Sequence, residues 1–216
     1  ALANIWTRYE MTYDAHLEGN ERMYVFYTPA VFAKYGYSTS SPYPLSTTLK
    51  RNFPEVEEAC AFCYWEKSDV TTEEGVKHNA RMILADSCYM DMFHIRIVEG
   101  TNDFLYTDGK IAVTQEFAQR AFGTTHVLGE KIIDIEENVH TICAVLEGAT
   151  SHSNFSFDYW GEGTYFRKFY NDWSNYAYTT VIKLHEGTDL NDFLDKTKEV
   201  KDLVNRFSST DYNLYP

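Results

Sequence analysis

The chain has 216 residues, enough for one large domain or two small ones, and its 44% apolar and 24% charged content is typical of a globular chain. Its 32 acidic residues exceed its 19 basic ones, and the net charge of −13 comes without a basic cluster, which argues against nucleic acid or anionic lipid as a ligand. No apolar run approaches the roughly 20 residues that cross a bilayer, and no signal peptide opens the sequence.

The first part of the sequence predicts a helix, a strand and a second helix. Apolar residues recur at helical spacing over residues 3–18, and residues 22–28 alternate between apolar and polar side chains as in a strand. Leu45, Leu49 and Phe53 then mark a short helix, which the following proline breaks.

A hairpin and a short helix are predicted next. Residues 56–70 form one predicted strand, and residues 76–86 form its partner across a turn that contains a glycine. Ser87 is the predicted N-cap of the helix that follows, with Met90 and Phe93 facing inward.

The clearest local unit is the strand followed by a helix over residues 109–123. Thr114 is its predicted N-cap, and Gly123 ends the helix because glycine tolerates the left-handed conformation. A hairpin is predicted over residues 130–148, with its polar turn at Glu136–Asn138.

The end of the sequence predicts a strand, a long helix and a further strand. Residues 176–184 alternate as a strand, and residues 188–207 form an amphipathic helix with Asp189 as its N-cap. Residues 211–216 resemble the start of another strand. Strands interleaved with helices predict an α+β chain, with two subdomains.

Cysteine pairs are the first candidates for chemistry. Cys60 and Cys63 in CAFC, with His140 and Cys143 in HTIC, offer the four ligands of tetrahedral zinc. Both pairs fall in predicted strands, where residues three apart point to opposite faces, so we expect no metal site and cysteines that pack as small apolar residues. A redox role for CAFC is disfavoured because the nearby acids raise a thiol pKa. A disulfide that involves Cys88 or Cys143 stays open.

No catalytic or cofactor-binding residue is predicted. Ser151, His152, Ser153 and Asp158 lie close in sequence, but no nucleophile-elbow motif accompanies them, and closeness in sequence says little about a triad. No nucleotide-binding loop or zinc-protease motif is present.

Aromatic residues are dense between residues 153 and 178, and they are the remaining candidate for function. Exposed aromatic side chains supply large contact areas for a partner or a carbohydrate, although such residues more often form core. The candidate contact residues in this stretch are Phe155, Tyr159, Trp160, Tyr165 and Trp173.

Seven stretches in order across nearly the whole chain resemble the periplasmic core domain of MacB-like ABC transporter permeases, a family that includes FtsX- and LolC-type proteins. Each stretch alone is a weak signal, and the ordered series is fairly specific; the CAFC pair is not part of it. The stretches are "YEMTYDAHLEGNERMYVFY", "FPEVEEA", "DSCYMDMFHIRIVEG", "IAVTQEFAQRAFG", "LGEKI", "HTICAVLEGATSHSNFSFD" and "TTVIKL".

The resemblance implies a division of the chain into a porter-like α/β subdomain and an inserted, smaller β-rich subdomain. Residues 20–108 and 175–216 would form the porter-like part, residues 109–174 the insertion, and residues 1–19 a helix that follows a membrane helix. The joints between the two subdomains are expected near residues 107–109 and near residues 172–175.

The resemblance also implies a function without catalysis in this domain. Cofactors are absent from it, because ATP binds a separate cytoplasmic subunit or domain, and the full permease works as a homo- or heterodimer in the bacterial inner membrane. The domain in the periplasm would couple ATP hydrolysis to export or to a periplasmic adaptor or substrate. The alternative is a secreted carbohydrate- or peptide-binding module that uses the aromatic residues between 153 and 178.

Overall fold

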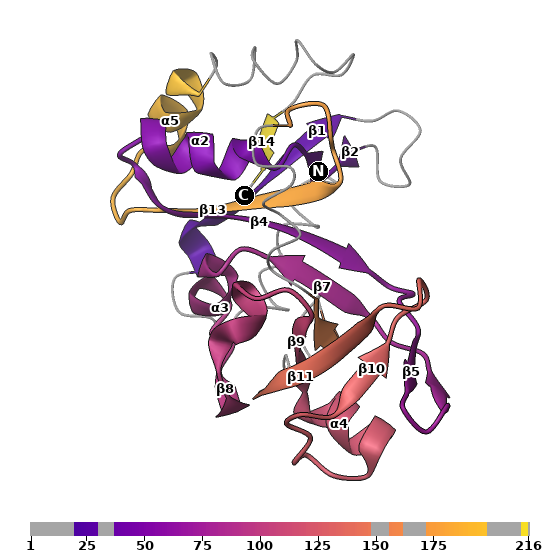
Figure 1. Cartoon of the computed structure of the whole chain (residues 1–216). Helices are drawn as coiled ribbons and strands as arrows, with labels where there is room; N and C mark the ends of the chain where they lie inside the picture. The colour runs from indigo at the N-terminus through magenta and orange to yellow at the C-terminus, as the bar shows by residue number, and fades with distance from the viewer. Residues whose placement is uncertain (1–19, 30–36, 148–155, 162–171, 198–212, 216) are drawn as a thin grey trace. The chain divides into compact units, whose positions relative to one another are not determined.

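A computed structural model (Figure 1) shows two compact units, each described here by itself. The first unit combines residues 1–62 with residues 169–216, and the second is residues 63–168. The predicted helix over residues 3–18 lies outside the described part of the chain. The structure describes residues 20–29, 37–147, 156–161, 172–197 and 213–215.

The first unit is built on an antiparallel sheet with the strand order β14-β1-β13-β4. The predicted strands at residues 22–28, 176–184 and 211–216 are confirmed as β1, β13 and β14. Two short strands, β2 and β3, pair with the ends of β1 and β13, and a 3-10 turn precedes β1. The bounds are η1 Asn20–Arg22, β1 Met23–Pro29, β2 Tyr37–Ser38, β3 Ser40–Ser41, β4 Val56–Trp65, β13 Tyr178–Leu184 and β14 Asn213–Tyr215.

Helices α2 (Pro44–Asn52) and α5 (Leu190–Lys196) cover one face of this sheet (Figure 1). Proline suits the first turn of α2, and Asp189 caps α5 by accepting hydrogen bonds from the backbone N–H groups of residues 191 and 192. The predicted cap of α5 is therefore confirmed, while residues 198–207 of the predicted helix lie outside the described residues. The buried core between helices and sheet consists of Phe26, Leu45, Leu49, Phe53, Val56, Ala59, Ile182, Leu184 and Phe193.

The second unit has a mixed sheet with the strand order β7-β12-β9-β11-β10-β5-β6, and β8 pairs with β11. The β9–β11 and β7–β12 pairs are parallel, and the other pairs described in this sheet are antiparallel. The bounds are β5 Val70–Thr72, β6 Lys77–His78, β7 Met82–Ala85, β8 Ile97–Gly100, β9 Lys110–Thr114, β10 Lys131–Ile133, β11 Val139–Leu146 and β12 Tyr159–Trp160.

Helix α4 (Gln115–Phe122) follows β9 directly and confirms the predicted strand–helix unit. The Thr114 hydroxyl accepts the backbone N–H of Phe117 at 3.2 Å, and Gly123 ends the helix with a φ of 72°. Phe117 and Ala118 are fully buried on the sheet, so the apolar face of α4 lies where its spacing predicts. The hairpin predicted after it is likewise confirmed as β10 and β11.

Three predicted elements differ from the structure. The strand expected over residues 76–86 is two short strands, β6 and β7. The single strand expected over residues 56–70 is two strands, β4 and β5, because the polar stretch between them leaves the sheet. Helix α3 is only Cys88–Met92, the side chain of Ser87 makes no capping hydrogen bond, and Tyr89 and Met92 are buried instead of the predicted Met90 and Phe93. A 3-10 turn, η2 (Asn102–Leu105), follows β8.

The two-unit architecture matches the expected discontinuous unit with an insertion, but the boundaries differ. Residues 63–108 belong to the second unit because β5, β7 and β8 pair with β10, β12 and β11. The chain passes between the units at residues 62–63 and 168–169. The joint expected at residues 107–109 therefore lies inside the second unit.

A backbone bulge in β11 requires a glycine in the neighbouring strand. The register of β11 on β9 shifts between Ile142 and Ala144, which leaves Cys143 as the extra residue. Its carbonyl oxygen accepts the N–H of Thr101 at 3.0 Å and would lie 2.1 Å from a Cβ atom added at Gly100. Gly100 also has a φ of +95°, so both space and conformation favour glycine there.

Candidate functional site

Both short-spaced pairs of the sequence analysis lie in strands, as predicted, but regular strand alternation separates the side chains of only one pair. Cys60 and Cys63 lie in the continuous strand β4, where residues three apart point to opposite faces. The second pair spans the bulge at Cys143, where strict alternation fails. There, each side chain has another partner: His140 Nε2 lies 2.9 Å from Asp134 Oδ2, and Cys143 donates to the Ile111 carbonyl at 3.4 Å.

Thiol chemistry finds no support in the electrostatics of the second unit. Burial, with a smaller contribution from the charge of Asp86, raises the pKa of the Cys63 thiol far above its ordinary value. Burial also raises the pKa of Cys143, whose thiol is not part of a disulfide. Both residues are therefore protonated near neutral pH and are poor nucleophiles.

Two of the five aromatic residues proposed as partner contacts are core residues. Tyr159 is 2% exposed and Trp160 is fully buried, and the Tyr159 hydroxyl lies 2.5 Å from Ser68 Oγ. Tyr89, Phe104 and Phe157 pack their rings around Trp160. These two residues are thus unavailable to a partner, because their side chains are buried in the core of the unit.

Of the other three aromatic candidates, one packs on the first unit and two lie outside the described residues. Trp173 is partly buried and packs against the core of the first unit. Phe155 and Tyr165 lie outside the described residues, so their place in a contact surface stays a prediction.

A buried carboxylate forms the strongest polar cluster in the second unit. Asp158 is 4% exposed; its Oδ2 accepts Arg81 Nε at 3.1 Å and the Arg81 backbone N–H at 2.8 Å, and its Oδ1 accepts Arg120 Nη2 at 3.0 Å. Its backbone carbonyl also accepts the N–H of Thr114 at 2.9 Å. The cluster therefore ties the segment 156–161 to β9 and α4.

The protonation of Asp158 follows from competing effects. Burial opposes the charged form, but hydrogen bonds from Arg81 and Arg120 outweigh it and lower the pKa of the carboxyl below its ordinary value. The group is therefore an ionised anchor at neutral pH, with two cations in contact. Such a carboxylate is a weak base. Ser151, His152 and Ser153, its neighbours in the sequence, lie outside the described residues.

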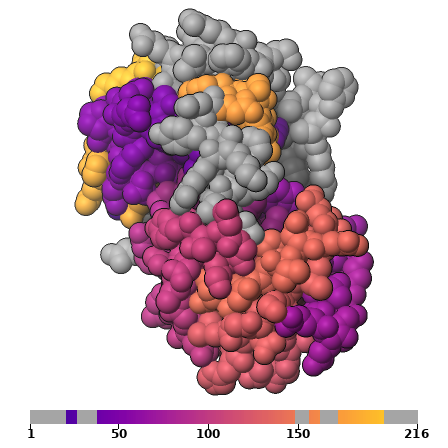
Figure 2. Space-filling model, viewed as in Figure 1, coloured from indigo at the N-terminus to yellow at the C-terminus, as the bar shows by residue number. Residues whose placement is uncertain are grey.

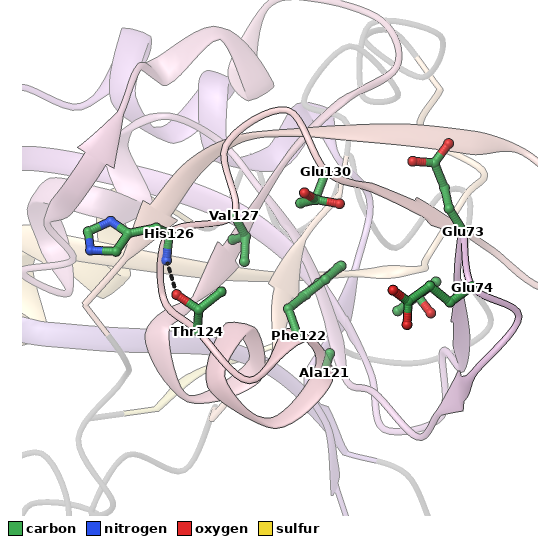
Figure 3. Close-up of a pocket in the computed structure, with 9 residues that line it drawn as sticks. Glu73, Glu74, Ala121, Phe122, Thr124, His126, Val127 and Glu130 are labelled. Atoms are coloured by element: carbon green, nitrogen blue, oxygen red, sulfur yellow. Dashed lines mark hydrogen bonds between the residues drawn. The ribbon is translucent and has the colours of Figure 1, made fainter.

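A small surface cavity of about 200 Å³ lies beside the C-terminal end of α4 (Figure 3). Ala121, Phe122 and Val127 supply its apolar lining, while the β5–β6 turn and Glu130, directly before β10, supply carboxylates. Figure 2 shows the β5–β6 hairpin beside β10 on the surface of this unit. The lining residues are Thr72, Glu73, Glu74, Ala121, Phe122, Thr124, His126, Val127 and Glu130.

Sequence reasoning missed both the Asp158 cluster and this cavity. Asp158 meets arginines 77 and 38 positions away, and the cavity joins residues 72–74 to residues 121–130, so no local pattern reports either of them. The one available signal was an acid directly between two aromatic residues, Phe157 and Tyr159, since an acid there needs a cationic partner when it is buried.

In the described part of the chain, no helix has both the length and the apolar character needed to cross a membrane.

Comparison with known proteins gives likenesses in structure alone. No family model matches the sequence, and no curated protein sequence matches it either. A domain of a protein described as a permease from Porphyromonas gingivalis has a TM-score of 0.79 at 19% identity, with 93% of this chain and 92% of that chain covered.

Two further solved structures are similar over most of the chain. The periplasmic region of MacB from Actinobacillus actinomycetemcomitans has a TM-score of 0.64 at 10% identity and covers 89% of this chain and 87% of its own. The extracellular domain of the ABC-type transporter YknZ from Gram-positive bacteria has a TM-score of 0.64 at 16% identity, with 90% of this chain and 100% of that chain covered. The predicted α+β fold is thus confirmed: the chain has the fold of the periplasmic domains of MacB-type transporters.

Proposed function

We propose that this chain is the extracytoplasmic domain of an ABC-type permease, held in the bacterial inner membrane by helices outside the sequence given and facing the periplasm. The observation that carries the proposal is the TM-score of 0.79 over 93% of the chain to a domain of a protein described as a permease. The acidic composition supports it, because a net charge of −13 favours an aqueous surface over a lipid-bound one.

In this proposal the domain itself performs no catalysis and binds no cofactor. A cytoplasmic ATPase subunit or domain hydrolyses ATP, and the permease, as a homo- or heterodimer, passes the resulting motion to the two units described above. The motion then acts on a periplasmic adaptor or substrate, so that the work of the domain is export or mechanical transmission. Two compact units within one chain are compatible with such motion, since interfaces between units of one chain are usually modest.

The location of the domain is tested by cysteine labelling of the full permease in spheroplasts. Glu136 is an exposed residue in the β10–β11 turn, so Glu136→Cys offers a reactive thiol. We expect a membrane-impermeant maleimide to label this variant without lysis. The unsubstituted protein is the control for its four native cysteines, and labelling of Glu136→Cys only after lysis would place the domain in the cytoplasm.

The coupling is tested by replacing residues 20–215 of the full permease with a flexible glycine–serine linker. We expect export to be lost while ATP binding by the partner subunit is retained, because the proposed role of the domain lies after hydrolysis. Export at the normal rate by the linker variant would contradict a role in transmission.

A further inference from the structure

The cavity at the end of α4 has the size of a side chain. Its volume of about 200 Å³ is below the roughly 300–1,000 Å³ that pockets for drug-sized ligands occupy. Its apolar lining is held in place, because Ala121 and Phe122 pack against the core of the second unit and Val127 is 1% exposed. A ligand group the size of one or two side chains would fit there, against an apolar surface that the core holds in place.

The charges around the cavity have one sign. Glu73, Glu74 and Glu130 line it, whereas no lysine or arginine does. Lys131 pairs with Glu73 at 2.9 Å, and within the described residues Glu74 and Glu130 make no ion pair. Figure 3 shows Phe122 between Glu74 and Glu130, with the His126 ring turned away from them. A cationic group in the cavity would meet two carboxylates that no other cation engages.

A bare metal ion does not suit this arrangement. The carboxylate oxygens of Glu73, Glu74 and Glu130 do not all lie within 4.8 Å of one another, so they do not converge on one point as the ligands of a cation do. An aromatic ring between the carboxylates is also a poor neighbour for a hydrated ion. The cavity instead combines an apolar base with an anionic rim, which matches a long aliphatic stem that ends in a charge.

Two exposed apolar residues lie close in sequence to residues that line the cavity, which favours a macromolecule as the ligand. Val76, two positions after Glu74, is 49% exposed, and Leu128, which follows Val127, is 42% exposed. Apolar side chains beside a charged pocket are typical of protein contact surfaces, where a long side chain fills the pocket and its neighbours exclude water.

We propose that this cavity receives a lysine or arginine side chain from a basic segment of a partner protein. The stem of that side chain packs on Phe122 and Val127, and its charge meets Glu74 and Glu130. The proposal names a contact for the periplasmic partner of the proposed function and rests on it in that respect, but the binding itself is measurable on the domain alone.

The test uses the ¹⁵N-labelled 216-residue chain and three acetylated, amidated octapeptides. The probe alternates lysine with glycine, the second peptide replaces lysine by diaminobutyrate, and the third replaces it by glutamine. We expect the lysine probe to shift the amide resonances of Phe122, Val127 and Glu130. At about pH 6.5 the diaminobutyrate peptide has the same charge but two fewer methylenes a side chain, so it should bind about tenfold more weakly, and the glutamine peptide should not bind.

The carboxylates are tested by the double substitution Glu74→Gln and Glu130→Gln. Both residues are exposed, so folding should be unchanged, and the lysine probe should bind about fivefold more weakly. The control is Glu116→Gln with Glu136→Gln, which removes the same charge from exposed positions that do not line the cavity and should leave the affinity unchanged.

Several results would overturn the proposal. Equal affinity for the lysine and diaminobutyrate peptides, or an equal loss in the two double variants, would mean attraction to net charge alone. Calcium chloride that shifts the same amides and displaces the probe would indicate an ion site. If the probe binds as expected but Glu136→Cys is labelled only after lysis, the cavity assignment stands and the proposed function fails. If Glu136→Cys is labelled without lysis but the probe does not bind, only the cavity assignment fails.

Discussion

The two units of the molecule differ in how the chain builds them. The first unit joins both ends of the sequence, so that residue 23 in β1 pairs with residue 183 in β13. The second is one continuous stretch, in which the helix α4 follows its strand directly and the hairpin β10–β11 needs a turn of five residues. Local contacts form at a smaller entropic cost, so we expect the second unit to form first as the chain folds.

The two units also differ in where their ion pairs lie. In the first unit Arg22 and Lys183 pair with Glu57 at a partly exposed position. In the second unit Asp158 is nearly enclosed, while its partners Arg81 and Arg120 have side chains that are 36% and 46% exposed. The difference teaches that the second unit, besides surface ion pairs such as Lys131–Glu73, has a nearly buried carboxylate whose ion pairs fix a segment, whereas Glu57 pairs at a partly exposed position in the first unit.

The largest expected effect comes from removing one buried aromatic ring from the core of either unit. Phe117→Ala in the second unit and Phe193→Ala in the first each remove a fully buried ring, and each should lower the free energy of unfolding by about 3–5 kcal/mol. Hydrogen exchange should show Phe117→Ala opening β9 and β11, and Phe193→Ala opening β1 and β13. Equal loss of protection in all four strands from either variant would mean that the two units unfold as one.

Gly100→Ala tests the bulge in β11. An added Cβ meets the Cys143 carbonyl in a backbone conformation that alanine rarely adopts, so unfolding should become easier by up to about 3 kcal/mol. Gly75→Ala is the matched control, since Gly75 also has a positive φ but has open space around its Cβ position. A denaturation midpoint that falls equally in both variants would assign the cost to φ alone.

Asp158→Asn tests the buried cluster, with an expected loss of about 2 kcal/mol at neutral pH, since two half-exposed guanidinium groups lose their acceptor and can still hydrate. The pKa of Asp158 is lowered on folding, so its contribution is complete above the ordinary value near 3.8 and is lost as the pH falls through the lower, folded value.

The measurement is urea denaturation of both proteins between pH 7 and pH 3. The difference between them should stay constant down to about pH 4 and then shrink. Asp108→Asn, at an exposed turn position, is the control and should match the wild-type protein. A difference that grows towards acid would mean that the pKa of Asp158 is raised on folding.

The smallest effect is expected for Glu57→Gln in the first unit. Ion pairs near the surface gain little in water and weaken in salt, so the free energy of unfolding should change only slightly and by less at high ionic strength. A loss as large as that of Asp158→Asn would remove the proposed contrast between the two units.

Local patterns predicted most of the elements and the α+β class, while the unit built from both ends of the chain was implied by the resemblance to MacB-like permeases. Thr114, Gly123 and Asp189 act as the caps that their positions indicate, because capping depends on residues within one turn of the helix. Helix α3 was predicted less well, since its buried residues Tyr89 and Met92 are set by what packs against them.

The boundary between the units and the candidate site were beyond local reasoning. Which strands pair is decided by contacts between distant segments, so residues 63–108 could not be assigned to the second unit from spacing alone. The burial of Tyr159 and Trp160 could not be predicted either, because a run of aromatic residues has the same sequence pattern whether it lies in a core or on a surface.

The cluster around Asp158 has a consequence for how this chain should vary among its relatives. A lineage that loses the carboxylate keeps two guanidinium groups facing the space it occupied, and their mutual repulsion then favours the loss of Arg81 or Arg120 as well. Correlated substitution of these three positions, more than invariance of any one of them, would therefore be the evolutionary trace of this anchor.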